Sequence, residues 1–288
     1  MKKLKRIVVG IDIFEKSNNV IKRALVVAKE NKAELFIVHA VQTPWLSIPS
    51  YFGGKEIAVD VKGIKKRIDK KMKILNRDAN VPYAIVVKEG NADDILLYES
   101  KLLKADMLML GNGKGKKNIL GTTAEKVAHQ SHLPVLIVKN SVKDPYQNIL
   151  APTDFQEQSK QSILFAKNIF TEAKIKVVHT YETFYIADIY TADSYTVESL
   201  DLEQYTKAIK DSAQNDLKKF INELSIKKGG IINGESDSKE SLLKYINKGS
   251  YDLVVVGSRG TTGFKALLGS VTSSILREAN TDVLVYVP

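Results

Sequence analysis

The sequence predicts an α/β protein made of two tandem domains, each with a parallel sheet that carries helices on both faces. Two observations predict this class. The 288-residue chain repeats one series of motifs after about 140 residues, and short apolar runs alternate with segments of helical periodicity in both copies. Such alternation is typical of βαβ units with parallel strands and right-handed crossovers. With 44% hydrophobic residues, each copy is long enough to bury its own core.

The first copy opens with an apolar run at 7–11, which predicts a strand buried on both faces of a sheet. Residues 17–30 place apolar side chains at helical spacing, and a second apolar run ends at His39. After an irregular stretch with two prolines and two glycines, residues 64–75 are expected to form a helix with isoleucine and methionine on one face. The expected order continues with strand 83–87, helix 92–104, strand 107–110, helix 122–130 and strand 135–138.

The second copy repeats this order from a strand at 148–153 to a final strand at 283–287. Its second helix is expected within 200–224. The irregular segment before that helix is aromatic, with Tyr181, Phe184, Tyr185, Tyr190 and Tyr195. The segment 140–147, which contains Pro145, is the expected linker. We therefore expect domains at 1–140 and 147–288.

Composition excludes several classes of protein. The chain has no cysteine, which excludes disulfides, a thiol nucleophile and cysteine-based metal sites. No apolar run approaches the roughly 18 residues of a membrane span, and a cytoplasmic location is expected. Charge is uneven, because residues 1–144 carry a net charge of +12 and residues 145–288 a net charge of −2. The first half could attract an anionic partner.

Glycines near the end of each copy suggest an anion site. In the second copy the sequence Gly257-Ser258-Arg259-Gly260 follows a strand, and Gly269-Ser270 opens the last helix. Glycines allow close backbone approach to a ligand, and a helix N-terminus offers unpaired N–H groups beside a positive dipole end. Arg259 could clamp a charge, and the Ser270 hydroxyl adds a donor. The alternative is an ordinary tight turn with Ser270 as a helix cap.

The combination of motifs resembles the universal stress protein family in its tandem two-domain form. The resemblance rests on the strand ending in Pro152-Thr153-Asp154, the strand ending in His179, and the glycine motif at 257–270. It implies Rossmann-like, open five-stranded parallel sheets of order 3-2-1-4-5, and in many members the binding of adenine nucleotides. The family motif has nine residues between its second and third glycines, whereas this chain has eight.

The resemblance implies an adenine-nucleotide site, for ATP or AMP, in the second copy. Asp154 suits ribose hydroxyls, because an ionised carboxylate only accepts hydrogen bonds; the alternative is a cap for the next helix. The backbone near Thr180 would close the base pocket. The residues carried over by resemblance are Pro152, Thr153, Asp154 and Thr180 for the base and ribose, and Gly257, Arg259, Gly260, Gly269, Ser270, Val271 and Thr272 for the phosphates.

The first copy departs from this pattern, and we expect a degenerate or altered site there. Lys114 replaces the second glycine of the motif, and Thr122 with Glu125 forms a capping-box sequence that could satisfy the amides a phosphate would use. Three lysines could still hold an anion. The residues of this degenerate site are Asp12, Gly111, Lys114, Gly121 and Thr122. A P-loop is absent from both copies.

Other candidate residues carry less weight. His39 and His179 each end a strand, where a structural role is the simpler interpretation. His129 and His132 form a weak metal site without nearby carboxylates, so no metal centre is expected. The basic helix at 65–73 could contact nucleic acid or membrane, but its apolar stripe favours a core-packed helix with a solvated face. The aromatic segment at 181–195 could cover a ligand, or fill a domain interface.

The expected function is that of an adenine-nucleotide-binding sensor or regulator of the stress response. The resemblance implies that the final strands of the two copies meet across an internal pseudo-twofold axis, and two chains could associate further into a homodimer. No nucleophile with an adjacent base is visible, so at most slow ATP hydrolysis is expected, with Mg²⁺ carried on the phosphates. Two alternatives stay open: an adenine-nucleotide α-hydrolase, and a nucleotide-free module for an anionic or lipid-like partner.

Overall fold

The structure is a computed structural model that describes residues 3–13, 17–41, 60–113, 121–141, 144–183, 202–234, 237–258 and 268–288. The first half contains β1 (Arg6–Gly10), α1 (Asn18–Asn31), β2 (Glu34–Val41), α2 (Val61–Leu75), β3 (Tyr83–Glu89), α3 (Ala92–Leu102), β4 (Met107–Gly111), α4 (Thr122–Gln130) and β5 (Val135–Val138). The second half contains β6 (Asn148–Pro152), α5 (Glu157–Ile169), β7 (Lys174–Tyr181), α7 (Leu202–Glu223), β8 (Lys228–Asn233), α8 (Ser238–Lys248), β9 (Leu253–Gly257), α9 (Ser270–Glu278) and β10 (Asp282–Tyr286).

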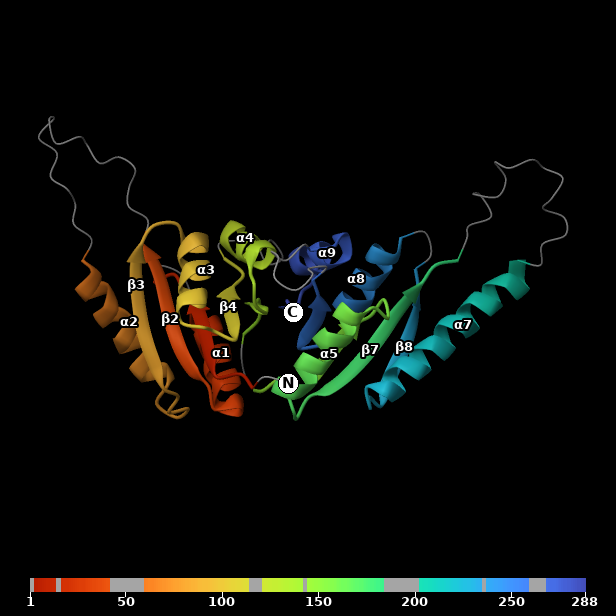
Figure 1. The fold of residues 1–288 in the computed structure, drawn as a ribbon, viewed down its shortest axis with the longest axis horizontal. Helices are drawn as coiled ribbons and strands as arrows, with labels where there is room; N and C mark the ends of the chain where they lie inside the picture. Colours follow the sequence, from red (N-terminus) through yellow and green to blue (C-terminus); the bar gives the residue numbers. More distant parts are fainter. Residues whose placement is uncertain are drawn as a thin grey trace, which may run out of the picture.

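The described strands form one continuous sheet in the order β3-β2-β1-β4-β5-β10-β9-β6-β7-β8. Strands are parallel within each half, and both halves follow the predicted order 3-2-1-4-5. The halves join through an antiparallel pair, β5 with β10, in which Leu136 lies opposite Leu284. This pairing confirms the predicted fold class and the predicted meeting of the two final strands, and Figure 1 shows the halves on either side of that central pair.

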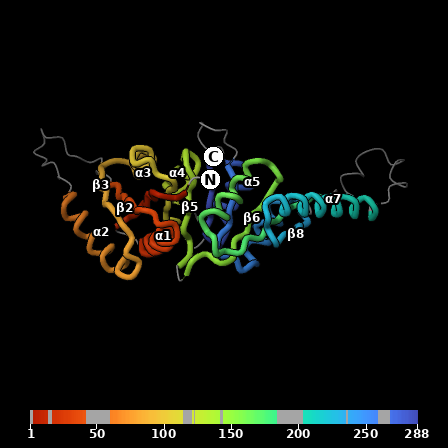
Figure 2. The backbone as a smooth tube through the Cα atoms, turned by 60° about the horizontal axis from the view of Figure 1, so that its bottom comes forward, coloured from red at the N-terminus to blue at the C-terminus, as the bar shows by residue number. Residues whose placement is uncertain are grey.

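The helices form two layers that cover opposite faces of the sheet. Helices α1, α2 and α5 pack on one face and α3, α4, α8 and α9 on the other, while α7 covers β7 and β8. The two layers can be followed in Figures 1 and 2. Helix α2 buries Ile68 and Met72 and exposes most of its lysines, which is the solvated basic face that the sequence favours. None of the described helices combines the length and the apolar character needed to cross a bilayer.

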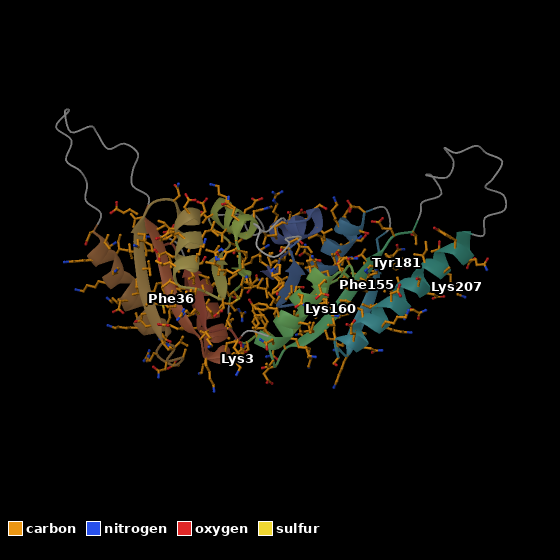
Figure 3. The ribbon with its side chains drawn as sticks, viewed as in Figure 1. Lys3, Phe36, Phe155, Lys160, Tyr181 and Lys207 are labelled. Carbon is orange, nitrogen blue, oxygen red and sulfur yellow. The ribbon has the colours of Figure 1, made fainter. Side chains whose placement is uncertain are left out.

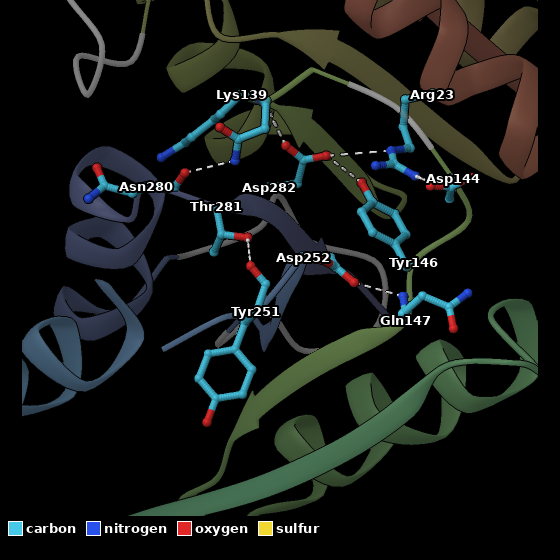
Figure 4. A network of polar contacts seen from close by, with 11 residues as sticks. Arg23, Lys139, Asp144, Tyr146, Gln147, Tyr251, Asp252, Asn280, Thr281 and Asp282 are labelled. Atoms are coloured by element: carbon cyan, nitrogen blue, oxygen red, sulfur yellow. Dashed lines mark hydrogen bonds and ion pairs between the residues drawn. The ribbon is translucent and has the colours of Figure 1, made fainter. Parts of the chain in front are cut away.

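A buried polar cluster fixes the junction between the halves (Figure 4). The Asp282 carboxylate accepts hydrogen bonds from Tyr146 Oη at 2.6 Å and from the backbone amides of Lys139 and Asn140 at 2.8 and 3.0 Å. The Arg23 guanidinium lies 3.6 Å from Asp282 and stacks over the Tyr146 ring at 3.8 Å. Burial raises the pKa of Asp282, and these donors oppose that shift. The cluster joins α1, the linker and β10.

Candidate functional site

A cavity of about 550 Å³ lies at the carboxyl ends of β6, β7 and β9. β6 and β9 are neighbours in the sheet but not in the sequence, so the cavity sits where the strand order reverses. In open α/β sheets this switch point is the usual place for a ligand. The residues predicted for the site that line this cavity are Pro152, Thr153, Asp154, Thr180, Gly257, Gly269, Val271 and Thr272.

The remaining predicted residues of this site are Ser270, Arg259 and Gly260. Ser270, the first residue of α9, is exposed and lies outside the lining. Arg259 and Gly260 fall outside the described residues. The structure therefore brings together the residues expected around base and ribose with the helix-start part of the phosphate motif.

The turn after β6 is held in an unusual conformation. Thr153 Oγ1 accepts a 2.9 Å hydrogen bond from the Phe155 amide and lies 2.9 Å from Ser159 Oγ. Phe155 has φ 64°, in the left-handed region that non-glycine residues rarely adopt. Its ring packs 4.2 Å from the His179 ring and 5.4 Å from the Phe220 ring, centroid to centroid. Figure 3 labels Phe155 beside α5 and α7. These contacts hold a strained turn of the kind found at functional sites.

This turn presents the Asp154 carboxylate at the cavity. Asp154 is exposed, and its Oδ1 accepts a 3.1 Å hydrogen bond from the Gln156 amide just before α5. The interpretation of Asp154 as the helix cap is wrong, because Gln156 is the N-cap of α5; the Asp154 side chain instead supports the turn before the helix. Among the described residues, Oδ2 has no hydrogen-bond partner. One carboxylate oxygen is therefore available to accept a hydrogen bond from a ligand.

Neither histidine ends its strand, because β2 runs to Val41 and β7 to Tyr181, but the two have the same contact in both halves. His179 Nδ1 lies 2.9 Å from the Thr153 carbonyl oxygen, and His39 Nδ1 lies 2.9 Å from the Ile11 carbonyl oxygen. Each ring thus holds the end of the neighbouring first strand through one nitrogen. The repetition favours a structural role for both histidines, although the His179 ring also lines the cavity.

Close packing around Gly257 and α9 shapes the phosphate side of the cavity. A Cβ atom on Gly257 would lie 2.8 Å from the Gln158 carbonyl oxygen, so only glycine fits between the end of β9 and the start of α5. Thr272 Oγ1 donates a 3.1 Å hydrogen bond to the Gly257 carbonyl oxygen and ties α9 to β9. Gly269 is the N-cap of α9, and as a glycine it has no side chain that could accept a hydrogen bond from the first amides of the helix. The start of α9 therefore faces the cavity through backbone atoms.

In the first half, backbone atoms close the position after β4 that corresponds to the cavity after β9. The Gly121 amide, before α4, donates a 2.8 Å hydrogen bond to the Asn112 carbonyl oxygen. A Cβ atom on Gly113 would lie 3.1 Å from the Gly121 Cα, which shows how tightly the loop after β4 approaches α4. Gly111 ends β4, Thr122 begins α4, and Asp12 follows β1. Lys114 falls outside the described residues.

The predicted capping box between Thr122 and Glu125 at the start of α4 is wrong. The N-cap of α4 is Gly121, and the Glu125 carboxylate accepts hydrogen bonds from the Arg277 guanidinium of α9. This ion pair connects the two helices that begin at the two glycine motifs. A local sequence pattern could not reveal it, because the two residues lie 152 positions apart.

His129, His132 and Tyr181 lie outside the lining of the cavity. Within the described part of the chain, no three histidine, cysteine, aspartate or glutamate side chains gather as a metal site. Burial lowers the pKa of His132, and Lys101 lowers it further. Tyr181 ends β7, while the rest of the aromatic segment, from residue 184, falls outside the described residues.

Sequence reasoning missed several residues of the cavity wall. α5 and α8 contribute through their first turns, and β9 contributes the residue after its last glycine. These residues are Gln156, Gln158, Ser159, Ser238, Leu242 and Ser258. Of these, Ser258 lies inside the glycine motif, and Ser159 recurs as Ser17, five residues after the aspartate in each copy. Gln156, Gln158, Ser238 and Leu242 reach the cavity through tertiary packing that local patterns do not encode.

A sheet that is parallel within each half, with a cavity at its switch point, defines a doubly wound α/β protein. The model of the Universal stress protein family matches residues 3–139 and 145–287. The chain belongs to this family and contains two copies of its domain.

Relatives and solved structures agree with this assignment. A universal stress protein of Methanocaldococcus jannaschii is 30% identical over 145 residues, which are 49% of this chain and 85% of that protein. A universal stress protein structure from Archaeoglobus fulgidus superposes with a TM-score of 0.69 at 16% identity, covering 98% of this chain and 97% of that chain. A functionally unknown protein from Pseudomonas aeruginosa gives 0.71 at 16% identity, covering 98% and 92%. At these identities the two structures show a shared fold.

Proposed function

We propose that the second half of the chain binds an adenine nucleotide, ATP or AMP, in the cavity between β6 and β9, and that the protein acts as a nucleotide-dependent sensor or regulator in the stress response. The cavity itself carries this proposal. Its volume of about 550 Å³ lies in the range of small-molecule sites, roughly 300 to 1,000 Å³. Binding of adenine nucleotides by many members of the family supports the choice of ligand.

The chemistry of the lining fits the three parts of a nucleotide. The unpaired oxygen of Asp154 can accept from ribose hydroxyls. Pro152 and Thr180 line the cavity, and we assign them to the base. The start of α9, with Gly269, Val271 and Thr272, supplies amides and a positive dipole end for phosphates. We assign Gly257, Ser270, Arg259 and Gly260 to the same phosphate end on the resemblance.

The first half is proposed to have lost this function. The Gly121 amide, which would face a phosphate, already donates to the Asn112 carbonyl oxygen at 2.8 Å. A nucleotide would have to break this hydrogen bond and open the loop. The first half would then keep the residues of a degenerate site, Asp12, Gly111 and Thr122, but the entrance for a nucleotide would be closed. We therefore expect one nucleotide per chain.

Several further features belong to the same proposal. The two domains would span 1–140 and 147–288, and Mg²⁺ would arrive on the phosphates and not on a protein cluster. The protein would work in the cytoplasm as a binder with at most slow hydrolysis of ATP. The two halves already form an internal pseudo-dimer through β5 and β10. A homodimer of two chains would form in addition to this internal pairing.

Isothermal titration calorimetry with ATP, AMP and GTP tests the proposal. We expect saturable binding of ATP or AMP at one site per chain, with weaker binding of GTP. A pyrophosphate assay run beside it should show at most slow turnover. Rapid pyrophosphate release would favour an α-hydrolase enzyme instead. An absence of heat at millimolar nucleotide would favour a nucleotide-free interaction module.

A further inference from the structure

The outer helix of the first half carries a dense positive charge. α2 contains seven lysine or arginine residues and one aspartate. The corresponding helix of the second half, α7, contains four lysines and four acidic residues. The two helices pack on the third strand of their halves, β3 and β8, at opposite ends of the molecule (Figures 1 and 2). The fold does not require the charge of α2, because the same position in the second half is neutral.

Most of this charge is not neutralised by neighbouring groups. Lys62, Lys66 and Lys70 are exposed and form a row along α2, because residues four positions apart lie on the same side of a helix. Within the described part of the chain, none of these three lysines forms an ion pair. The one acidic side chain of the helix, Asp69, is already used, because it lies 2.7 Å from Lys73 Nζ. The row is therefore available to an anionic partner.

The positive charge also extends to both sides of this row. A helix turns by about 100° per residue, so the exposed residues Lys65 and Arg67 lie on opposite sides of the row. A flat anionic surface would meet the row alone, whereas a groove with phosphates on both walls would also meet the two flanks. The major groove of B-form DNA is about 12 Å wide and admits an α-helix. The arrangement of charge on α2 thus favours a groove.

The other residues of α2 argue against a membrane or a single strand as the partner. Amphipathic helices bind membranes through an apolar face, but Ile68 and Met72 of α2 are 1% and 0% exposed because they pack in the core. Single strands are held by stacking on aromatic side chains, and α2 contains no aromatic residue. The backbone of a duplex, in contrast, is bound by lysine and arginine without stacking or insertion.

We propose that α2 binds the phosphate backbone of double-stranded DNA, with its basic row directed into the major groove and without preference for a sequence. This inference is independent of the proposed nucleotide site, which lies in the other half of the chain. Binding through phosphates alone has dissociation constants of roughly 10⁻⁴ to 10⁻⁶ M at physiological salt, and it weakens steeply as salt is added.

Fluorescence anisotropy of a labelled DNA duplex of about 20 base pairs, titrated with the full chain at several salt concentrations, tests the proposal. The logarithm of the association constant should fall with the logarithm of the salt concentration, with a slope of about −0.9 per phosphate contact. The double variant Lys66→Gln, Lys70→Gln should make this slope shallower by about 2 and should lower the affinity at about 0.1 M salt at least tenfold.

Two further double variants serve as controls. Lys207→Gln, Lys210→Gln removes the same charge from exposed positions of α7 and should leave the slope unchanged. Lys66→Arg, Lys70→Arg keeps the charge of α2 and should keep the affinity for the duplex. The arginine variant separates a loss of charge from a loss of folding.

Three outcomes would overturn the inference. The first is a wild type that does not bind the duplex at low salt, and the second is an equal loss of affinity in the α7 variant. The third is tighter binding of the wild type to a single strand of the same length or to phosphatidylglycerol vesicles, which would assign α2 to that partner. A wild type that binds DNA but no ATP would overturn the proposed function and leave this inference standing.

Discussion

The side-chain nitrogen of Lys139 lies 2.7 Å from the Ala279 carbonyl oxygen and 2.8 Å from that of Leu276, at the C-terminal end of α9. Lys139 directly follows β5, so a residue of the first half caps a helix of the second. A cation at this end stabilises a helix through its unpaired carbonyls and its dipole. Because α9 begins at the cavity, the first half helps to hold the wall of the second-half site.

Lys139 should make stability depend on pH in a defined window. Burial lowers the pKa of Lys139 from its ordinary 10.5 to about 8, although Asp282 opposes the shift. Between these values the folded protein binds fewer protons at Lys139 than the unfolded chain, so its contribution to the free energy of unfolding rises with pH. The rise amounts to no more than about 3 kcal/mol.

Urea unfolding of the wild type and Lys139→Met at pH 7, 8.5 and 10 measures this effect. We expect the difference in unfolding free energy, wild type minus variant, to increase with pH. Lys167→Met is a control, because Lys167 also donates to a carbonyl at a helix end, that of Leu224 after α7, at 2.9 Å. If the difference in unfolding free energy between the wild type and Lys139→Met did not change with pH, the Lys139 ammonium group would titrate as it does in water.

Asp282→Asn should destabilise the junction. The substitution removes the charge that faces Arg23 and replaces one carboxylate oxygen by an NH2 group, so the side chain can no longer accept from both Tyr146 and the backbone amides of this buried cluster. Breaking a buried pair by removing one partner costs about 3–5 kcal/mol. Asp252→Asn is the comparison and should cost about 1 kcal/mol, because within the described structure Asp252 accepts hydrogen bonds from the Gln147 and Asn148 amides in a more exposed place. Denaturant melts of both variants give the two values, and similar losses would contradict a special role for the buried cluster.

Gly257→Ala and Gly111→Ala form a matched pair at the ends of β9 and β4. The added methyl group would lie 2.8 Å from the Gln158 carbonyl oxygen at Gly257, and within 4 Å of nothing at Gly111. Overpacking of this kind costs about 1–3 kcal/mol. We expect Gly257→Ala to lower both the melting temperature and the ATP affinity, and Gly111→Ala to change neither. Identical behaviour of the two variants in thermal melts and calorimetry would argue against the described packing.

Asp154→Asn should weaken ATP binding about tenfold through the ribose, because hydrogen bonds to a charged acceptor contribute about 1.5 kcal/mol or more. The same substitution should have little effect on 2′,3′-dideoxy-ATP, which lacks both ribose hydroxyls. Calorimetry of both nucleotides with both proteins forms a double-mutant cycle. Asp12→Asn in the first half is the control. A loss of the same size for the dideoxy nucleotide would place Asp154 away from the ribose.

Much of the fold follows from local patterns. The α4 helix at 122–130 and the β5 strand at 135–138 have the predicted bounds, because their apolar spacing and flanking residues are local signals. β2 runs to Val41, two residues beyond the predicted end at His39, since Ala40 and Val41 pair with Lys88 and Glu89 of β3. Strand ends that depend on a partner strand cannot be read from one segment.

The residues of the candidate site could be predicted where a sequence motif marks them, and could not where residues distant in the sequence meet. Asp154 and the glycines of the second half carry sequence signals, and the cavity lies between them. Phe155 has a left-handed backbone conformation although it is neither glycine nor asparagine, so its residue type does not predict that conformation. The conformation depends on contacts with Thr153, His179 and Phe220. The contact of Lys139 with Ala279 spans 140 positions. Such contacts arise from pairing of the two halves, which no local pattern specifies.

Photoaffinity labelling with 8-azido-ATP, followed by peptide mapping, tests the location of the nucleotide most directly. The azide sits on the base, so we expect label in peptides that cover 148–183, with competition by unlabelled ATP and a stoichiometry of one per chain. Competable label in residues 3–113, or two labels per chain, would contradict a single site in the second half.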